Sequence, residues 1–368
     1  MKKVSLITIF DNPNFGTYLQ ALALTLVLER HGVKVEIIRY KRKCLFPKSR
    51  LRKWTPFLDP IRLIRDFLFP NKWINQIKLC HKFISQYVSL TKQYSSYSEL
   101  EKDPPKADIY LTGSDQVWNT SHNHGIDKAF YLAFAPKNAP KLAYAASIGM
   151  SEIPEQYKAE TKQLLDEYDC ITVREKNAVD LLKQIGISAK EVLDPTLLLD
   201  RNEWTKYAAP RIVTEPYLLV YSVESKERDF IISRIARKIA QKKGLKVVEV
   251  SYTGTSKEIP DCDSHIYYAT PDMFLSAILH SSYVVVSSFH GTAFSINFNK
   301  NFVTVAPDRF SSRIDSLLEK TNLINRKVCS EENLDESFFS EDIDFSEANA
   351  VLQKERAESM LFFDSMPR

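Results

Sequence analysis

The chain has 368 residues, 44% of them hydrophobic, and a net charge of +4 from 50 Lys and Arg against 46 Asp and Glu. This length exceeds the size at which one hydrophobic core stops growing, so two domains are expected. No apolar run approaches the ~20 residues that span a bilayer, and five cysteines without CxxC spacing argue against a zinc knuckle or a disulfide framework. The first residues predict a strand rather than a secretion signal, so we expect a cytoplasmic protein.

The chain begins with a β-α-β pattern. Residues 4–10 predict a strand, and a polar loop leads into an amphipathic helix that continues to residue 32 and a second strand at residues 33–38. The loop holds one glycine and lacks the GxGxxG pattern of dinucleotide-binding proteins. Strand-end loops bind ligands in such folds, although the same residues could simply shape the start of the helix. The residues concerned are Asn14, Gly16 and Gln20.

Positive charge is concentrated in residues 41–98, where 13 Lys and Arg stand against two Asp, giving 13 − 2 = +11. Tryptophan and phenylalanine are interleaved with these cations. A helical lid with a solvated face is one explanation, and peripheral contact with an anionic membrane is the alternative. Residues 327–368 carry 4 − 11 = −7 and offer an internal partner for the same charges. No nucleic-acid-binding motif is present, so nucleic acid is not expected as a partner.

A dense polar cluster, GSDQVWN at residues 113–119, follows the predicted strand 107–112. Amides and carboxylates of this kind hydrogen-bond sugar hydroxyls, and an indole ring offers a stacking face. The residues assigned to these contacts are Asp115, Gln116, Trp118 and Asn119. A helix cap followed by a buried tryptophan is the alternative, but it does not explain the whole cluster. The nearby pair His122 and His124 has no further spaced ligand, so no metal site is predicted.

Arg174 stands at the exit of a predicted strand at residues 170–173. A rigid bidentate donor at a strand end suits a carboxylate or a phosphate. The alternative is an ion pair with Glu175 or Asp169. Both interpretations remain open from the sequence alone.

A second α/β series begins after a linker at residues 199–216, where the periodic pattern lapses. Its predicted strands are residues 217–222, 246–251, 283–286 and 302–305, and its helices are residues 229–242 and 271–280. The chain therefore divides into an N-terminal Rossmann-like domain, a C-terminal Rossmann-like domain and a final helix that crosses back to the first. The expected limits are residues 1–205, 206–345 and 346–368, with the basic segment as a helical insertion in the first.

The stretch 283–298 joins a buried strand, a polar elbow and a new helix, whose first N–H groups would form an anion cradle. His290 in this elbow is either a general acid or a satisfied structural histidine. The remaining residues expected around a bound anion are Ser288, Gly291, Thr292, Arg309 and Arg313.

Seven short blocks in this order resemble the polysaccharide pyruvyl transferase family. They are NFGTYLQA (14–21), GSDQVWN (113–119), YAASIG (144–149), TVRE (172–175), LDPT (193–196), SFHG (288–291) and SRI (312–314). The resemblance implies two Rossmann-like domains in a glycosyltransferase B-like arrangement with a cleft between them. It also implies transfer of the enolpyruvyl group of phosphoenolpyruvate to a sugar as a pyruvate ketal, in bacterial capsule or exopolysaccharide biosynthesis.

The resemblance assigns roles to individual residues and shows one departure. Many family members carry an arginine two residues before the motif histidine to hold phosphoenolpyruvate, and Ser288 stands there in this chain. His290 is then the expected proton donor, Arg174 the leading cation and Asp115 the carboxylate that orients or deprotonates a sugar hydroxyl. Phosphoenolpyruvate is a co-substrate, and no metal or other cofactor is expected. The expected acceptor is a glycan or a lipid-linked oligosaccharide at the inner membrane face.

Two other functions remain compatible with the sequence. A nucleotide-sugar glycosyltransferase of the same architecture could place its diphosphate at the helix start near Ser288. A non-catalytic glycan-binding protein could have kept the fold without the arginine.

Overall fold

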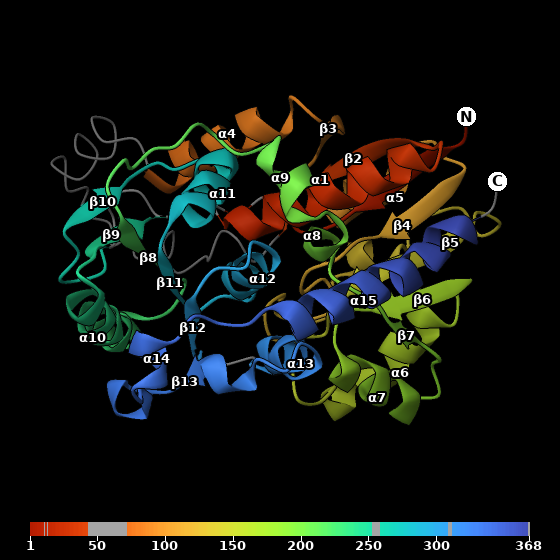
Figure 1. Ribbon diagram of the computed structural model, residues 1–368. Helices are drawn as coiled ribbons and strands as arrows, with labels where there is room; N and C mark the ends of the chain where they lie inside the picture. Colours follow the sequence, from red (N-terminus) through yellow and green to blue (C-terminus); the bar gives the residue numbers. More distant parts are fainter. Residues whose placement is uncertain (11, 13, 43–71, 252–257, 308–310, 367–368) are drawn as a thin grey trace, which may run out of the picture.

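Two parallel β-sheets covered by helices form the two lobes of the molecule (Figure 1). The computed structural model describes residues 1–10, 12, 14–42, 72–251, 258–307 and 311–366. This arrangement confirms the predicted α/β class with two Rossmann-like units.

The N-terminal sheet has, within the described residues, seven strands in the order β3-β2-β1-β4-β5-β6-β7, all parallel to their neighbours. The strands are β1 (Lys3–Ile7), β2 (Lys34–Tyr40), β3 (Ser89–Tyr94), β4 (Ile109–Thr112), β5 (Lys141–Ala146), β6 (Cys170–Val173) and β7 (Lys190–Glu191). Every residue of β4 and β5 is buried, as expected for central parallel strands with helices on both faces.

The helices of this lobe connect successive strands. They are α1 (Phe15–Arg30), α4 (Lys72–Ile84), α5 (Tyr97–Lys102), the 3-10 helix η2 (Lys128–Tyr131), α6 (Glu155–Leu165), α7 (Lys176–Gln184), α8 (Pro195–Leu198) and α9 (Arg201–Thr205). Helix α1 is buried along most of its length because it lies between the lobes, against α8 and also α11 (Pro271–His280) of the second lobe.

The C-terminal sheet has six parallel strands in the order β10-β9-β8-β11-β12-β13 within the described residues. The strands are β8 (Tyr217–Tyr221), β9 (Lys246–Val250), β10 (Ser264–Ile266), β11 (Tyr283–Val286), β12 (Phe302–Val305) and β13 (Lys327–Val328). The remaining helices are α10 (Lys226–Lys243), α12 (Phe289–Asn297), α13 (Ser312–Lys320), η4 (Ile324–Arg326), η5 (Glu331–Asn333), α14 (Ser337–Ser340) and α15 (Ser346–Asp364).

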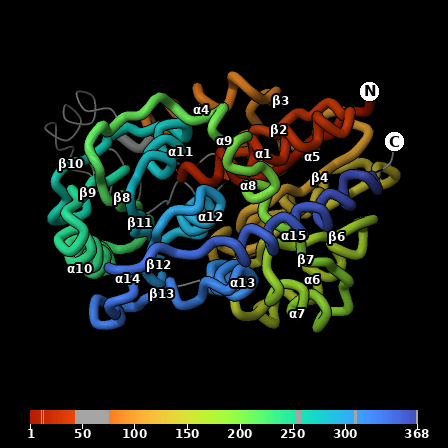
Figure 2. Tube along the Cα trace, in the orientation of Figure 1, coloured from red at the N-terminus to blue at the C-terminus, as the bar shows by residue number. Residues whose placement is uncertain are grey.

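Helix α15 runs from the second lobe back across the first (Figure 2). Its Ser359 Oγ accepts a hydrogen bond of 3.0 Å from the backbone N–H of Leu193. The rings of Phe362 and Phe363 pack on Tyr144 of β5, with centroids 5.0 and 4.7 Å away. The last helix therefore ties the two lobes together through buried contacts.

Residues 41–98 were expected to form a helical insertion, but Ser89–Tyr94 within them form strand β3. Strand β3 extends β2 at the edge of the sheet, with Thr91 and Tyr94 turned inward and Lys92 exposed. Exposed residues between buried ones suit an edge strand, whose outer face stays in water, and the strand was overlooked because the charge pattern dominates the region. Residues 43–71, which hold 7 of the 13 Lys and Arg of this segment, lie outside the described residues.

Ligands bind open parallel sheets at the carboxyl ends of strands where the strand order reverses. In the N-terminal sheet this reversal falls between β1 and β4, and in the C-terminal sheet between β8 and β11. The motif GSDQVWN follows β4, and the elbow that contains His290 follows β11. The topology therefore places both motifs at ligand-binding positions.

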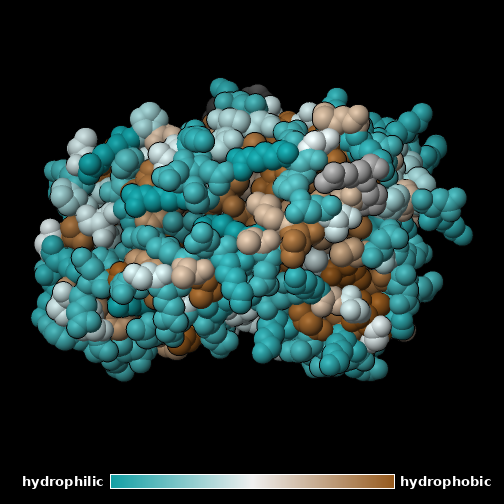
Figure 3. All heavy atoms as spheres, turned by 45° about the vertical axis from the view of Figure 1, so that its right-hand side comes forward, coloured by the Kyte–Doolittle hydropathy of each residue, from teal (hydrophilic) through white to brown (hydrophobic). Residues whose placement is uncertain are grey.

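The surface seen in Figure 3 is largely hydrophilic, and hydrophobic residues show through it in separate groups. Among the described residues, no helix combines the length and apolar character that crossing a bilayer requires.

Candidate active site

Charged side chains from both lobes converge on a small volume between the two sheets. They come from the exits of β4, β6 and β7 in the first lobe and from α12 and α13 in the second. The five residues are Asp115, Arg174, Asp194, His290 and Arg313.

Asp194 is the centre of the cluster, and its side chain is fully buried. Its Oδ1 accepts hydrogen bonds from the backbone N–H and the hydroxyl of Thr196, at 2.9 and 2.6 Å, and so caps helix α8. Its Oδ2 accepts from Arg174 Nη1 at 2.7 Å and from Ser114 Oγ at 2.9 Å. Burial by itself disfavours this carboxylate, but Arg174 and His290 outweigh it and lower the pKa of Asp194.

Arg174 is 5% exposed and bridges the two lobes. Its Nη2 lies 3.6 Å from Asp115 Oδ1, and its guanidinium carbon lies 4.5 Å from the ring centroid of Phe289 on α12. Neither Nε nor Nη2 of this buried group has a hydrogen-bond acceptor among the described residues. Arg174 forms an ion pair, as the alternative interpretation expected, but its partners are Asp194 and Asp115 and not Glu175 or Asp169.

Arg313 reaches the same phenyl ring from α13, with its guanidinium carbon 6.0 Å from the centroid of Phe289. Burial of the side chain, and then repulsion from Arg174, lower the pKa of Arg313 to about 10. Its Nε has no hydrogen-bond acceptor among the described residues. Two cations therefore lie near one another with donors available for an anion.

His290 begins helix α12 and is 4% exposed. Its Nε2 lies 3.9 Å from Asp194 Oδ2 and has no hydrogen-bond acceptor within the described part of the chain. Burial lowers the pKa of His290 to about 4, despite the opposing effect of Asp194 and Asp115. The imidazole is therefore neutral near pH 7 when the site holds no ligand.

Gly16 explains how His290 is held in place. A Cβ built on Gly16 would lie 2.1 Å from His290 Cγ, so only glycine allows α1 to pack against the imidazole. Asn14 caps α1 by accepting from the N–H of Gly16 at 3.0 Å, and it also accepts from the Tyr221 hydroxyl of the second lobe at 3.4 Å. The loop before α1 and the start of this helix thus pack against the histidine.

Asp115 has a positive φ of 76°, which turns its side chain toward the cluster directly after β4. Its Oδ2 accepts from Thr17 Oγ1 at 3.3 Å, and its Oδ1 accepts from the N–H of Gln116 at 2.9 Å. Burial alone would raise the pKa of this carboxyl, but Arg174, His290 and Arg313 lower it to about 2. Asp115 is therefore an ionised group that orients neighbours and is a weak base.

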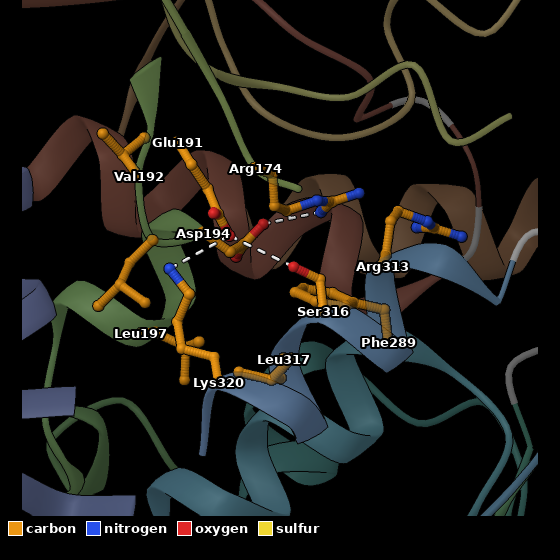
Figure 4. Close-up of a pocket in the computed structure, with 11 residues that line it drawn as sticks. Arg174, Glu191, Val192, Asp194, Leu197, Phe289, Arg313, Ser316, Leu317 and Lys320 are labelled. Carbon is orange, nitrogen blue, oxygen red and sulfur yellow. Dashed lines mark hydrogen bonds and ion pairs between the residues drawn. The ribbon is translucent and has the colours of Figure 1, made fainter. Parts of the chain in front are cut away.

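A small recess adjoins the cluster between β7, α8, α12 and α13 (Figure 4). Arg174, Arg313 and Phe289 line one side of it. On the other side Lys320 Nζ lies 3.1 Å from Glu191 Oε1 and 2.8 Å from Glu355 Oε2. This ion pair joins the second lobe to β7 and α15, so the recess has a fixed outer wall.

Three residues predicted around a bound anion at the start of α12 form hydrogen bonds within the elbow. Ser288 Oγ accepts the N–H of Gly291 at 3.0 Å, so this serine and this glycine satisfy each other as a helix cap. Thr292 is fully buried, and its hydroxyl donates to the Ser288 carbonyl at 3.0 Å and contacts Thr304 Oγ1 at 2.9 Å. These hydrogen bonds shape the elbow.

Three residues predicted to contact the acceptor are buried and have partners inside the protein. Trp118 is 2% exposed, stacks on Tyr131 with centroids 5.7 Å apart and donates from Nε1 to a backbone carbonyl at 3.0 Å. It is thus the buried tryptophan of the alternative interpretation. Gln20 is buried and donates to Thr8 Oγ1 at 2.8 Å. Asn119 is buried and donates to Gln116 Oε1 at 2.7 Å.

The other predicted site residues have mixed outcomes. Asn14 and Gln116 are partly exposed and remain placed to meet an acceptor. Arg309 lies outside the described residues. Asp194 was not singled out as a site residue, although the block LDPT that contains it was recognised. A buried Asp followed by Pro-Thr signals a helix cap, and only the fold reveals that its second oxygen holds Arg174.

Glu175, which the sequence offered only as an ion-pair partner of Arg174, holds a neighbouring loop instead. Its Oε1 accepts from Ser147 Oγ at 2.9 Å and from the N–H groups of Ile148 and Gly149 at 3.1 and 3.0 Å. It therefore fixes the exit of β5 beside Arg174. In the described part of the chain no three His, Cys, Asp or Glu side chains gather as a metal site.

The fold is that of glycosyltransferase B-like proteins. A UDP-N-acetylglucosamine 2-epimerase matches with a TM-score of 0.56 and 11% identity over 100% of this chain and 97% of its own. The MnaA protein of S. aureus, solved with UDP, matches with a TM-score of 0.55 and 12% identity, over 100% of this chain and 98% of its own. The UDP-GlcNAc 2-epimerase of Methanocaldococcus jannaschii matches with a TM-score of 0.52 and 10% identity, over 95% of this chain and 92% of its own. At such identities the likeness shows the fold alone.

The chain belongs to the polysaccharide pyruvyl transferase family, which matches residues 14–309. This finding confirms the resemblance of the seven sequence blocks, and it assigns the protein to a family of transferases with a glycan acceptor. A search of curated protein sequences found no significant match.

Proposed function

We propose that this protein transfers the enolpyruvyl group of phosphoenolpyruvate to a sugar of a polysaccharide or lipid-linked repeat unit, as a pyruvate ketal, in capsule or exopolysaccharide biosynthesis. The observation that carries the proposal is the pair of guanidinium groups of Arg174 and Arg313 on the ring of Phe289, with N–H donors that lack acceptors in the described structure. Two neighbouring cations with free donors favour a small ligand of several negative charges. Phosphoenolpyruvate, with a carboxylate and a phosphate, has this character.

In the proposed complex Arg174 and Arg313 hold the carboxylate and the phosphate, and His290 protonates C3. Arg313 supplies the guanidinium that Ser288 lacks in comparison with many family members. Asp194 and Asp115 hold Arg174 in place, at 2.7 and 3.6 Å. Preorganised cations of this kind stabilise charge that changes position during a reaction.

The chemistry needs proton transfer and anion binding. Protonation of C3 makes C2 electrophilic, so a sugar hydroxyl adds there, phosphate leaves and a second hydroxyl closes the ketal. One hydroxyl proton replaces the proton given to C3, and the other leaves with the phosphate. The mechanism includes no metal, nucleotide or other cofactor.

The acceptor side belongs, in this proposal, to residues 1–205 and the donor side mainly to residues 206–345, with residues 346–368 crossing back. Asn14 and Gln116 border the site with partly exposed amides suited to sugar hydroxyls. We place the protein in the cytoplasm, where residues 41–98 would bring it to the inner membrane face and its lipid-linked acceptor.

A nucleotide-sugar glycosyltransferase is the second candidate, since one protein of the same fold was solved with UDP. The carboxyl ends of β8 and β11, where the strand order of the C-terminal sheet reverses, do not favour a glycosyltransferase. Asp229 is buried there and accepts from Ser222 Oγ at 2.6 Å, and this serine lies 3.3 Å from Ser287 Oγ. A diphosphate at this position would meet a buried carboxylate.

The function is tested by incubating the protein with phosphoenolpyruvate and the lipid-linked glycan fraction of the source cells. We expect phosphate release together with a new ketal methyl signal in the glycan. The variant His290→Gln should reduce both by at least ~10²-fold, the lower range for loss of a general acid. His280→Gln, on α11 outside the cluster, is the matched control. Sugar transfer from a UDP-sugar without any use of phosphoenolpyruvate would support the glycosyltransferase instead.

A further inference from the structure

One face of helix α13 lines the recess beside the charged cluster. Four side chains on this helix recur with the i, i+3, i+4, i+7 spacing of a single helix face, namely Arg313, Ser316, Leu317 and Lys320. Arg313 stands at the start of this face and reaches the ring of Phe289. Lys320 stands at its end, about two turns further along. The helix therefore presents a donor-binding cation and a second cation to the same recess.

Glu191 of the first lobe holds the far end of this face. Its Oε1 lies 3.1 Å from Lys320 Nζ and accepts a hydrogen bond of 3.3 Å from Ser316 Oγ, and Figure 4 draws both contacts as dashed lines. Lys320 Nζ also lies 2.8 Å from Glu355 Oε2 on α15. The side chains of Glu191 and Lys320 are each 20% exposed, so solvent screens their pairing only in part. Helix α13 is thus held to β7 at two points.

Glu191 belongs to the same strand pair as Arg174. It lies opposite Val173 in the parallel pairing of β6 with β7, and Arg174 follows Val173 directly. The contact of Glu191 with α13 therefore ties the helix that carries Arg313 to the strands that carry Arg174. The two guanidinium groups repel each other, and Arg313 Nε has no hydrogen-bond acceptor among the described residues. Something other than their own contacts must therefore hold the two cations together.

We propose that Glu191 is a positioning residue of the donor site, which pins α13 to β7 and so holds Arg313 close to Arg174. This inference rests on the proposed function. Glu191 does not itself touch phosphoenolpyruvate. Without its carboxylate, α13 loses both contacts with β7, and the repulsion between the two guanidinium groups moves them apart. They then no longer converge on one anion, and the site loses its preorganisation.

Charge alone predicts the opposite effect of removing Glu191. A carboxylate in a recess lined by Arg174 and Arg313 repels an incoming anion. If Glu191 acted only through its charge, its loss should strengthen the binding of phosphoenolpyruvate. If it acted only on the stability of the fold, the Kd should stay unchanged. A positioning role predicts weaker binding, so the direction of the change separates the three explanations.

The test measures the Kd for phosphoenolpyruvate by calorimetry in the wild type, Glu191→Met and Glu191→Gln. Methionine removes both acceptor oxygens, whereas glutamine keeps an oxygen for Ser316 and loses the charge that holds Lys320. We expect the Kd to rise about 10-fold in Glu191→Met, equivalent to about 1.4 kcal/mol, and by less in Glu191→Gln. Glu358→Met is the matched control, because Glu358 pairs with Lys354 at 3.8 Å within α15. It should bind phosphoenolpyruvate as the wild type does.

A double-mutant cycle shows whether Glu191 acts through Arg313. In the Arg313→Met background, Glu191→Met should change the Kd by less than about twofold, because the group that it positions is gone. If Glu191→Met does not fold, Glu191→Gln takes its place in every comparison.

Two results overturn this inference and leave the proposed function intact. One is a Glu191 variant that binds phosphoenolpyruvate as tightly as the wild type or more tightly. The other is full additivity of the two substitutions in the cycle. A wild type that does not bind phosphoenolpyruvate overturns the proposed function and this inference with it.

Discussion

Replacing Arg313 with methionine should make the protein more stable and at the same time unable to hold phosphoenolpyruvate. Burial and the neighbouring Arg174 lower the pKa of Arg313 from 12.5 to about 10. A shift of roughly 2.5 pKa units corresponds to about 3 kcal/mol as an upper limit on the cost of the charge. Because the side chain is only half-buried, solvent screening reduces the expected gain to about 1–2 kcal/mol. Methionine keeps the apolar contact with Phe289.

The assay is denaturant unfolding of the wild type and Arg313→Met, each with and without phosphoenolpyruvate. At a concentration of about 100 times the Kd, the ligand should stabilise the wild type by about 2.7 kcal/mol. If the variant binds about 100-fold more weakly, the same concentration stabilises it by only about 0.4 kcal/mol. Arg237→Met is the matched control. Arg237 lies on α10, and its Nη1 pairs with Asp263 Oδ2 at 3.1 Å. This variant should leave the effect of the ligand unchanged.

Two results would contradict this reasoning. If Arg313→Met is less stable than the wild type without ligand, Arg313 has a structural partner and is not an unsatisfied cation. If phosphoenolpyruvate stabilises both proteins equally, Arg313 takes no part in binding the donor.

Four further predictions concern the same site and the basic segment. Phosphoenolpyruvate binding between about pH 4 and pH 7 should take up protons at His290, because an anion about 4 Å away raises the pKa of His290 from about 4 to about 7; affinity should therefore fall as pH rises from about 4 to about 7 and level off above that, and calorimetry in several buffers should show less proton uptake in His290→Gln. Gly16→Ala should displace this imidazole, costing about 1–3 kcal/mol of stability and most turnover; an active, stable variant would show that the contact relaxes. Ser288→Arg should remove a helix cap, lower stability by about 1 kcal/mol and leave turnover equal or reduced, since Arg313 already fills the site; a strong rise in turnover would refute this compensation. Residues 41–98 should bind anionic but not neutral liposomes at low salt in flotation, and equal recovery with both lipids would remove the membrane proposal.

The sequence predicted the architecture well because its signals are local. Short apolar runs followed by polar loops mark parallel strands, and β11 was predicted with the limits that the structure shows. The edge strand β3 was overlooked because an edge strand needs only a few inward residues, and the surrounding Lys and Arg obscured them. Periodicity alone does not distinguish such a strand from a charged helix.

The site was harder to predict because side-chain partners are distant in sequence. Trp118 and Ser288 stand in recognised blocks, yet one is a core residue and the other a helix cap. Asp194, which holds Arg174, lies 20 residues further along the chain. Such contacts depend on the order in which strands join the sheet, and no local pattern records that order.

The central claim is that the cluster between the lobes binds phosphoenolpyruvate. It is tested most directly by calorimetric titration of the wild-type protein with phosphoenolpyruvate and, separately, with UDP. The account predicts saturable binding of phosphoenolpyruvate that Arg313→Met weakens about 100-fold, and no binding of UDP. Saturable binding of UDP with no heat from phosphoenolpyruvate would contradict it.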